Sequence, residues 1–161
     1  MKKLTQTILI TSLLFISSFS FSQIPDMEKS YGWYPTQDQN DKLTKEQNLA
    51  AESAANIGTS KDKATEKKNA EEAGKHFANA RVTLEEIKKN RPENEKPSAS
   101  FNSIAIYKFH EAANDHHRAL MAELSKEKYD QRLVRRHAND FKNDMGYAET
   151  EHKKLIKEIN R

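Results

Sequence analysis

The C-terminal part of the chain contains almost none of the residues that interrupt a helix. From residue 99 to residue 161 there is no proline, and Gly146 is the only glycine. Apolar side chains recur there at spacings of three and four residues, which places them on one face of a helix. This stretch predicts long amphipathic helices and, with similar spacing upstream, an all-α fold.

The apolar repeat is interrupted once within this stretch. It runs through Leu120 and Leu124 and resumes at Val134, but charged and polar residues lie between. A single continuous helix is the alternative, yet its last turns would have no apolar surface to pack against, and packing supplies most helical stability. We therefore expect a turn near residues 125–128 that separates two long helices.

The residues before this stretch predict two more helices. Thr44-Lys-Glu-Gln47 fits a capping box at the start of a short helix, which Gly58 would end. Ser60 can cap a long helix, and the proline-containing residues 91–98 form the loop after it. Residues 43–161 are thus predicted to be an antiparallel bundle of three long helices plus a short N-terminal helix.

Residues 23–42 show no helical periodicity and contain two prolines and a glycine, so we expect an irregular arm. Three aromatic side chains in this arm are candidates for binding a partner, because rings with a polar tip are enriched at interfaces. They are Tyr31, Trp33 and Tyr34. The alternative is an arm that folds over its own bundle, since chain ends are often tied down in this way.

The first 22 residues have the features of a secretory signal peptide. Two lysines precede an apolar core at residues 8–16 that is too short to span a bilayer, and Ser20 and Ser22 offer small side chains to a signal peptidase. We expect cleavage after Ser22 and an exported chain, periplasmic or secreted, with no transmembrane segment after cleavage. The chain has no cysteine for lipid attachment.

The charge balance does not predict a nucleic-acid-binding protein. The formal net charge is +3, and two of the lysines leave with the predicted signal peptide. Nucleic-acid binding usually requires a clustered basic excess. The short run Arg132, Arg135 and Arg136 is more typical of a solvated helix face.

The predicted bundle has a thin core and no disulfide. Many of its apolar positions are alanine, and 32% of the residues are charged. Either the helices pack closely through alanine, or a protein partner in the cell envelope or self-association supplies further burial. No glycine-rich phosphate loop or other catalytic motif is present, so we do not expect an enzyme.

Histidines are the residues best suited to carry chemistry in this chain. Three of them, His110, His116 and His117, lie on the predicted third helix, on the two shoulders of its apolar stripe. The zinc-protease helix motif needs a histidine four residues after the first, where Asn114 stands, so that interpretation fails.

Antiparallel pairing about the loop and the turn would bring histidines from three helices to one level of the bundle. Imidazole together with carboxylate is a ligand set for zinc or copper, and bundles commonly build metal sites from facing helices. Asp140 would lie beside this group. The candidate metal ligands are His76, His110, His116, His117, His137 and Asp144.

Two functions follow from these features. The first is an exported, non-catalytic helical module that binds another macromolecule in the cell envelope, as an adaptor, holdase, inhibitor or complex subunit. It depends on the thin core, the aromatic arm and the absence of catalytic motifs. The alternative is a periplasmic copper- or zinc-binding protein whose histidine cluster lies inside the bundle.

Overall fold

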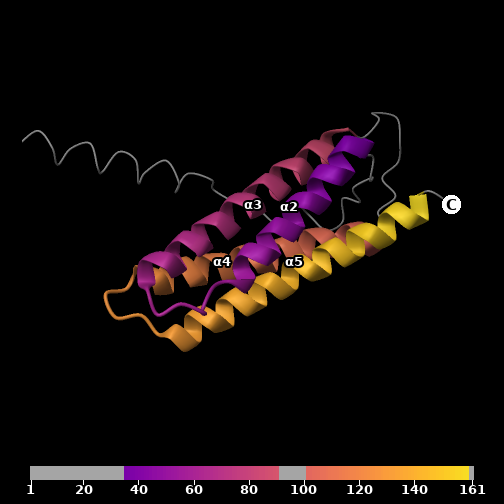
Figure 1. Cartoon of the computed structure of the whole chain (residues 1–161). Helices are drawn as coiled ribbons and strands as arrows, with labels where there is room; N and C mark the ends of the chain where they lie inside the picture. The colour runs from indigo at the N-terminus through magenta and orange to yellow at the C-terminus, as the bar shows by residue number, and fades with distance from the viewer. Residues whose placement is uncertain (1–34, 91–100, 160–161) are drawn as a thin grey trace, which may run out of the picture.

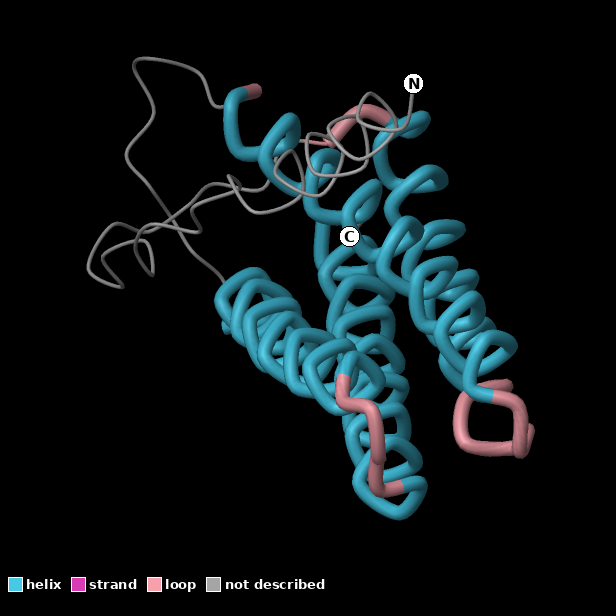
Figure 2. Tube along the Cα trace, turned by 90° about the vertical axis from the view of Figure 1, so that its left-hand side faces the viewer, coloured by secondary structure: helices cyan, strands magenta, loops and turns pink. Residues whose placement is uncertain are grey.

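The computed structural model describes residues 35–90 and 101–159, and these two segments fold into four α-helices (Figure 1). The helices are α2 (Gln37–Ala55), α3 (Lys63–Lys89), α4 (Phe101–Ser125) and α5 (Gln131–Ile159). No strand occurs in the described segments, as Figure 2 shows. The predicted all-α class is confirmed for this part of the chain.

Some sequence predictions fall on other parts of the chain. The signal peptide at residues 1–22, the aromatic residues Tyr31, Trp33 and Tyr34, and the loop at residues 91–98 lie outside the described residues. Within residues 35–90 and 101–159, no helix combines the length and hydrophobicity that crossing a membrane requires.

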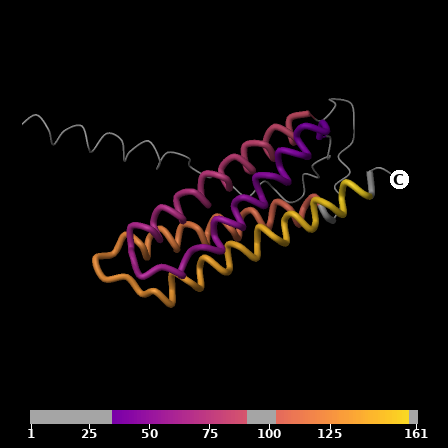
Figure 3. Tube along the Cα trace, viewed as in Figure 1, coloured from indigo at the N-terminus to yellow at the C-terminus, as the bar shows by residue number. Residues whose placement is uncertain are grey.

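Successive helices run in opposite directions and form two hairpins, α2 with α3 and α4 with α5 (Figure 3). α2 packs on α3 and α5, whereas α4 packs most extensively on α5 and only lightly on α3. Each described helix therefore has two neighbours, as in an up-down-up-down bundle.

The predicted turn between the two C-terminal helices is confirmed, because α4 ends at Ser125 and α5 begins at Gln131. The buried carboxylate of Glu123 stabilises this turn. It accepts a hydrogen bond from the backbone N–H of Asp130 at 2.8 Å and another from Lys126 Nζ. An N–H at a helix start has no helical carbonyl to pair with, so this side chain replaces it.

The predicted start of the first helix at Thr44 is wrong. The pattern Thr-x-x-Gln occurs twice, at Thr36–Gln39 and at Thr44–Gln47, and α2 uses the first copy. Thr36 Oγ1 accepts from the Gln39 N–H at 3.2 Å, and Gln39 Oε1 accepts from the Thr36 N–H at 2.9 Å. Pro35 suits a place just before the helix, because proline cannot lie in a helix interior without cost.

The second copy of the pattern lies inside α2, where Thr44 faces His152 and Gln47 is buried. The leading helix therefore has 19 residues, and its first residues fall in the segment predicted to be irregular. The start of α3 also differs, because Asp62 rather than Ser60 is its N-cap. The Asp62 carboxylate accepts from the backbone N–H groups of two residues in the first turn of α3.

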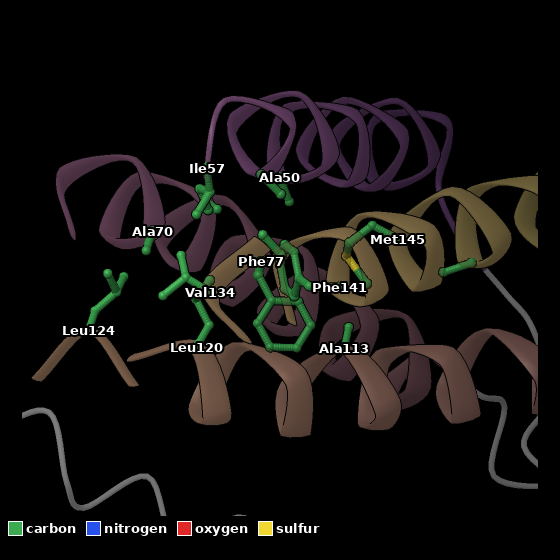
Figure 4. Packing of buried hydrophobic residues seen from close by; sticks show 14 residues of the cluster. Ala50, Ile57, Ala70, Phe77, Ala113, Leu120, Leu124, Val134, Phe141 and Met145 are labelled. Carbon is green, nitrogen blue, oxygen red and sulfur yellow. The ribbon is translucent and has the colours of Figure 1, made fainter. Parts of the chain in front are cut away.

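Eight of the 20 buried apolar residues in the described segments are alanine, as the sequence suggests for closely packed helices. Short side chains let helix backbones approach, so little space remains between them. The largest rings of the core, Phe77 of α3 and Phe141 of α5, meet edge-to-face with centres 5.5 Å apart (Figure 4). This ring pair lies where diagonally opposite helices face each other across the core.

Candidate metal centre

The five histidines predicted to share one centre divide into three groups. His110 and His117 of α4 face the core beside Phe77. His76 of α3 faces α2. His116 of α4 faces His137 of α5, with ring centres 6.2 Å apart. These five histidines cannot bind one metal ion together, because the three groups point in different directions and their ring nitrogens have different partners.

His110 is only 2% exposed and is bound to α2 through Gln47. The side-chain amide of Gln47 is hydrogen-bonded to Nε2 of His110, with 3.0 Å between the two atoms. Burial lowers the pKa of His110 to about 3, and the proximity of Arg81 and His152 contributes less. The side chain is therefore a neutral part of the core.

His117 lies between two phenylalanines, with ring centres 6.5 Å from Phe77 and 5.6 Å from Phe141. Its Nε2 donates to the carbonyl oxygen of Ala70 at 2.9 Å. Burial lowers the pKa of His117, although the bond to Ala70 opposes the shift. This nitrogen is committed to the α3 backbone, and the ring can approach it because residue 74 of α3 is glycine.

Substitution of Gly74 by alanine should destabilise the protein. A Cβ at residue 74 would lie 2.5 Å from Cε1 and Nε2 of His117, so the ring would have to move and give up its bond to Ala70. In an open helix the same change would stabilise by about 1 kcal/mol. We expect a net loss of about 1–2 kcal/mol from the clash and the lost bond.

The measurement is urea unfolding followed by circular dichroism, with Gly146→Ala as the matched control. A Cβ at Gly146 would have no atom within 4 Å, so the control should gain stability. Stabilisation of both variants would show that Gly74 is not needed to admit the imidazole.

His76 is held by carboxylates on both sides. Its Nδ1 lies 2.7 Å from Glu46 of α2, and its Nε2 lies 3.3 Å from Glu72 of its own helix. Asn79 also donates to Glu46 at 3.2 Å. With both ring nitrogens occupied, His76 serves the packing of α2 on α3.

His152, which the sequence analysis did not include among the ligands, has a similar role between α5 and α2. It is completely buried; its Nε2 donates to Asn40 Oδ1 at 2.9 Å, and Thr44 Oγ1 lies 3.3 Å from its Nδ1. Burial lowers the pKa of His152 to about 4. Three histidines of the other helices, His76, His110 and His152, thus hold α2 through polar contacts.

The remaining two histidines form a cluster with aspartates between α4 and α5. One potential ligand atom from each of His116, His137 and Asp140 lies within 4.8 Å of the other two, and all three residues are partly buried. In the described segments, no other group of three or more such residues is this compact. Asp144 adjoins the group, with its Oδ2 3.7 Å from His116 Nε2.

The cluster contains two buried polar atoms that no hydrogen bond satisfies within the described residues. They are Nδ1 of His137 and Oδ2 of Asp144; the other two such atoms in the described residues are Gln47 Oε1 and His110 Nδ1, at the contact between α2 and α4. A buried polar atom without a partner costs about 1–3 kcal/mol, so such atoms are rare and call for an explanation. A cation between α4 and α5 would supply a partner for both.

The electrostatics of the cluster also suit a cation. Burial raises the pKa of Asp144, and the charge of Asp140 raises it further, whereas His116 opposes the shift. Two neighbouring carboxylates repel each other when both are ionised. A divalent ion would relieve that repulsion and compensate the desolvation.

The ligand atoms of the cluster lie farther apart than those around a bound zinc ion. Ligand atoms that share one tetrahedral zinc lie about 3.3 Å apart, given bonds of about 2.0–2.2 Å. The observed limit of 4.8 Å would therefore need small rotations of three side chains. Partly exposed side chains can make such rotations.

The sequence pattern predicts His116 level with His137 and Asp144 among the ligands, whereas Asp140 lies outside the predicted ligand set. The signal that identifies Asp140 is the spacing of His137, Asp140 and Asp144 at i, i+3 and i+7, which puts all three on one face of α5. The structure joins this face to His116. It leaves His76, His110 and His117 elsewhere.

No family model, no curated protein and no solved structure matches the chain.

Proposed function

We propose that this protein binds a divalent transition-metal ion, zinc or copper, between α4 and α5. The ligands are His116, His137 and Asp140, and Asp144 is the fourth. The observation that carries the proposal is the convergence of His116, His137 and Asp140 within 4.8 Å, at a place where His137 and Asp144 each bury an atom without a hydrogen-bond partner.

The chemistry of the ligands supports this choice of metal. Two imidazoles with carboxylates suit zinc and copper, whereas calcium and magnesium prefer sites made entirely of oxygen. The chain has no cysteine that could draw the ion to a thiolate site. Binding one ion would also link α4 to α5 near the end of the bundle where their connecting turn lies.

Calorimetric titration of the metal-free protein with Zn²⁺ and with Cu²⁺ tests the proposal. We expect one site with a dissociation constant below about 10 μM, tighter than ordinary surface chelation. His116→Ala and His137→Ala should each weaken binding by about 100-fold, since loss of even an outer-shell partner costs 10–100-fold.

His76→Asn is the matched control. It removes an imidazole that lies outside the cluster and whose two nitrogens already face Glu46 and Glu72, so metal affinity should not change. Circular dichroism at pH 7.5 would verify that each variant is folded. Equal weakening by all three substitutions, or a wild-type site weaker than the stated limit, would contradict the proposed centre.

Export through residues 1–22 and binding to another macromolecule in the cell envelope, or self-association, remain proposals from the sequence. The aromatic residues offered for partner binding, Tyr31, Trp33 and Tyr34, lie outside the described residues. The metal proposal does not depend on them.

A further inference from the structure

A shallow, largely open groove of about 560 Å³ adjoins the metal cluster at the start of α5. Its lining comes from successive turns of one face of the helix, and it ends at Asp140, which is also a proposed metal ligand. The lining residues are Gln131, Arg132, Arg135, Arg136, Asn139 and Asp140. The groove and the cluster therefore share one carboxylate.

The groove is strongly cationic, with three guanidinium groups against a single carboxylate. Arg132 and Arg136 lie four residues apart, in line with Asp140 a further four residues on, so they follow one another along α5. Arg136 Nε lies 3.8 Å from Asp140 Oδ2. Arg132 forms no ion pair with any residue of the described segments.

Two lining side chains are fixed by the connection between α2 and α3. Arg135 donates from Nε and Nη2 to the carbonyl oxygen of Gly58, at 3.3 and 2.8 Å. Gln131 Nε2 donates to the carbonyl oxygen of Ser60 at 2.8 Å. Because a guanidinium has five N–H donors, Arg135 keeps donors for a ligand while its position is held.

We propose that this groove binds a small oxyanion, a phosphate, sulfate or carboxylate group, and that the oxyanion and the metal ion strengthen each other's binding. The coupling depends on the proposed metal function. Asp140 Oδ2 lies 3.8 Å from Arg136 Nε and 4.0 Å from His116 Nδ1, so the same oxygen faces both sites.

The coupling has a simple electrostatic cause. Without metal, the Asp140 carboxylate neutralises Arg136 and repels an incoming anion. A metal ion that takes up this carboxylate leaves the guanidinium of Arg136 for the anion and adds its own positive charge. A bound anion in turn neutralises Arg136, which otherwise competes with the metal ion for the Asp140 carboxylate. By linkage, each ligand raises the affinity of the other by the same factor.

Charge and size favour a small oxyanion over a nucleic acid. Arginine presents a planar set of donors that matches the oxygens of phosphate and carboxylate groups. The chain as a whole is close to neutral in formal charge, at +3 over 161 residues, so it lacks the extended basic surface that a long polyanion needs.

The test is titration of the full folded chain with Co²⁺, followed by visible absorption, in sulfate and in chloride at equal ionic strength. Sulfate is the oxyanion probe because it stays soluble with Co²⁺. We expect the Co²⁺ affinity to be about fivefold higher in sulfate, at the lower end of usual coupling between sites. The double variant Arg132→Gln/Arg136→Gln should bind Co²⁺ with no dependence on sulfate.

The control is the double variant Lys142→Gln/Lys153→Gln, which changes two lysines of α5. This double variant removes two positive charges from the same helix at residues that do not line the groove, so it should keep the sulfate dependence. Equal loss in both double variants would overturn the groove as a site and leave only a general charge effect.

The two proposals fail in different ways. Co²⁺ binding that is the same in sulfate and in chloride would overturn the oxyanion inference and leave the metal centre intact. Absence of Co²⁺ binding would overturn the metal function and the coupling together. The oxyanion site would then be judged on the metal-free protein by amide chemical shifts of residues 131–140 in sulfate. Shifts that the arginine variant abolishes would retain the site, and their absence would overturn it.

Discussion

Lowering the pH from 7 to 5 should destabilise the folded protein by about 4 kcal/mol, because two buried histidines stay neutral in the folded state. Burial lowers the pKa of His110 to about 3 and that of His152 to about 4. Both are at most 2% exposed, so solvent screens these shifts little. The expected loss is a large part of the 5–15 kcal/mol that stabilises a typical domain.

The direction of the effect follows from which state takes up protons. Well above pH 6.5, the ordinary pKa of histidine, both the folded and the unfolded chain leave His110 and His152 neutral, so these groups cost no stability. Below it, the unfolded chain binds protons that the folded chain rejects. Each histidine then costs about 1.4 kcal/mol per pH unit until its folded pKa is reached. His117, whose pKa burial also lowers, acts in the same direction.

Carboxylates contribute little in this pH window. The backbone bond from Asp130 lowers the pKa of Glu123 below 4.5, so its stabilising effect is lost only at lower pH. Burial raises the pKa of Asp144, and the proton that Asp144 then takes up in the folded state would oppose the loss. The histidines therefore dominate between pH 6.5 and pH 5.

Urea unfolding at pH 5, 6, 7 and 8, with a chelator present to exclude metal, measures this slope. Gln47→Leu/His110→Leu is the diagnostic variant, because replacing both partners of a buried hydrogen bond by apolar groups is often neutral or stabilising. It should keep its stability at pH 7 and lose about half of the pH dependence between pH 6.5 and 5. An unchanged slope in this variant, or a flat wild-type profile, would exclude His110 as a source of acid lability.

The helical fold class and the turn after Ser125 could be predicted from the sequence, because both depend on patterns several residues long. It could not separate the Thr-x-x-Gln pattern at Thr36 from its copy at Thr44. Both satisfy the local chemistry of a cap, and the choice falls to tertiary packing. With Thr36 as the cap, Thr44 meets His152 and Gln47 meets His110 inside the bundle.

The sequence predicts the height of the candidate site along the bundle axis better than it predicts which residues belong to the site. Level follows from the position of a turn and a rise of about 1.5 Å per residue, so an error of two residues still leaves His116 near His137. The direction in which a side chain points is harder to predict, because each step of one residue rotates it by about 100° around the helix axis. Adjacent His116 and His117 therefore serve different faces, one toward the aspartates and the other toward Ala70.

Phe141→Ala should be the most damaging single substitution in the described core, with a loss of about 3–5 kcal/mol. Phe141 is fully buried, and its ring meets Phe77 at 5.5 Å and His117 at 5.6 Å between ring centres. Alanines already bring the surrounding backbones together, so the helices cannot move inward to fill the cavity. The better helix propensity of alanine returns only about 0.5 kcal/mol.

Tyr147→Ala is the matched control, because it removes a ring of similar size from the same helix at a position that is 56% exposed. It loses a contact with Phe109, at 5.3 Å between ring centres, and should cost no more than about 1 kcal/mol. The measurement is the urea concentration at the midpoint of unfolding for both variants at pH 7.5. Similar losses would mean that the alanine contacts between neighbouring helices hold the bundle together. A much larger loss for Phe141→Ala would show that the ring pair across its centre does so.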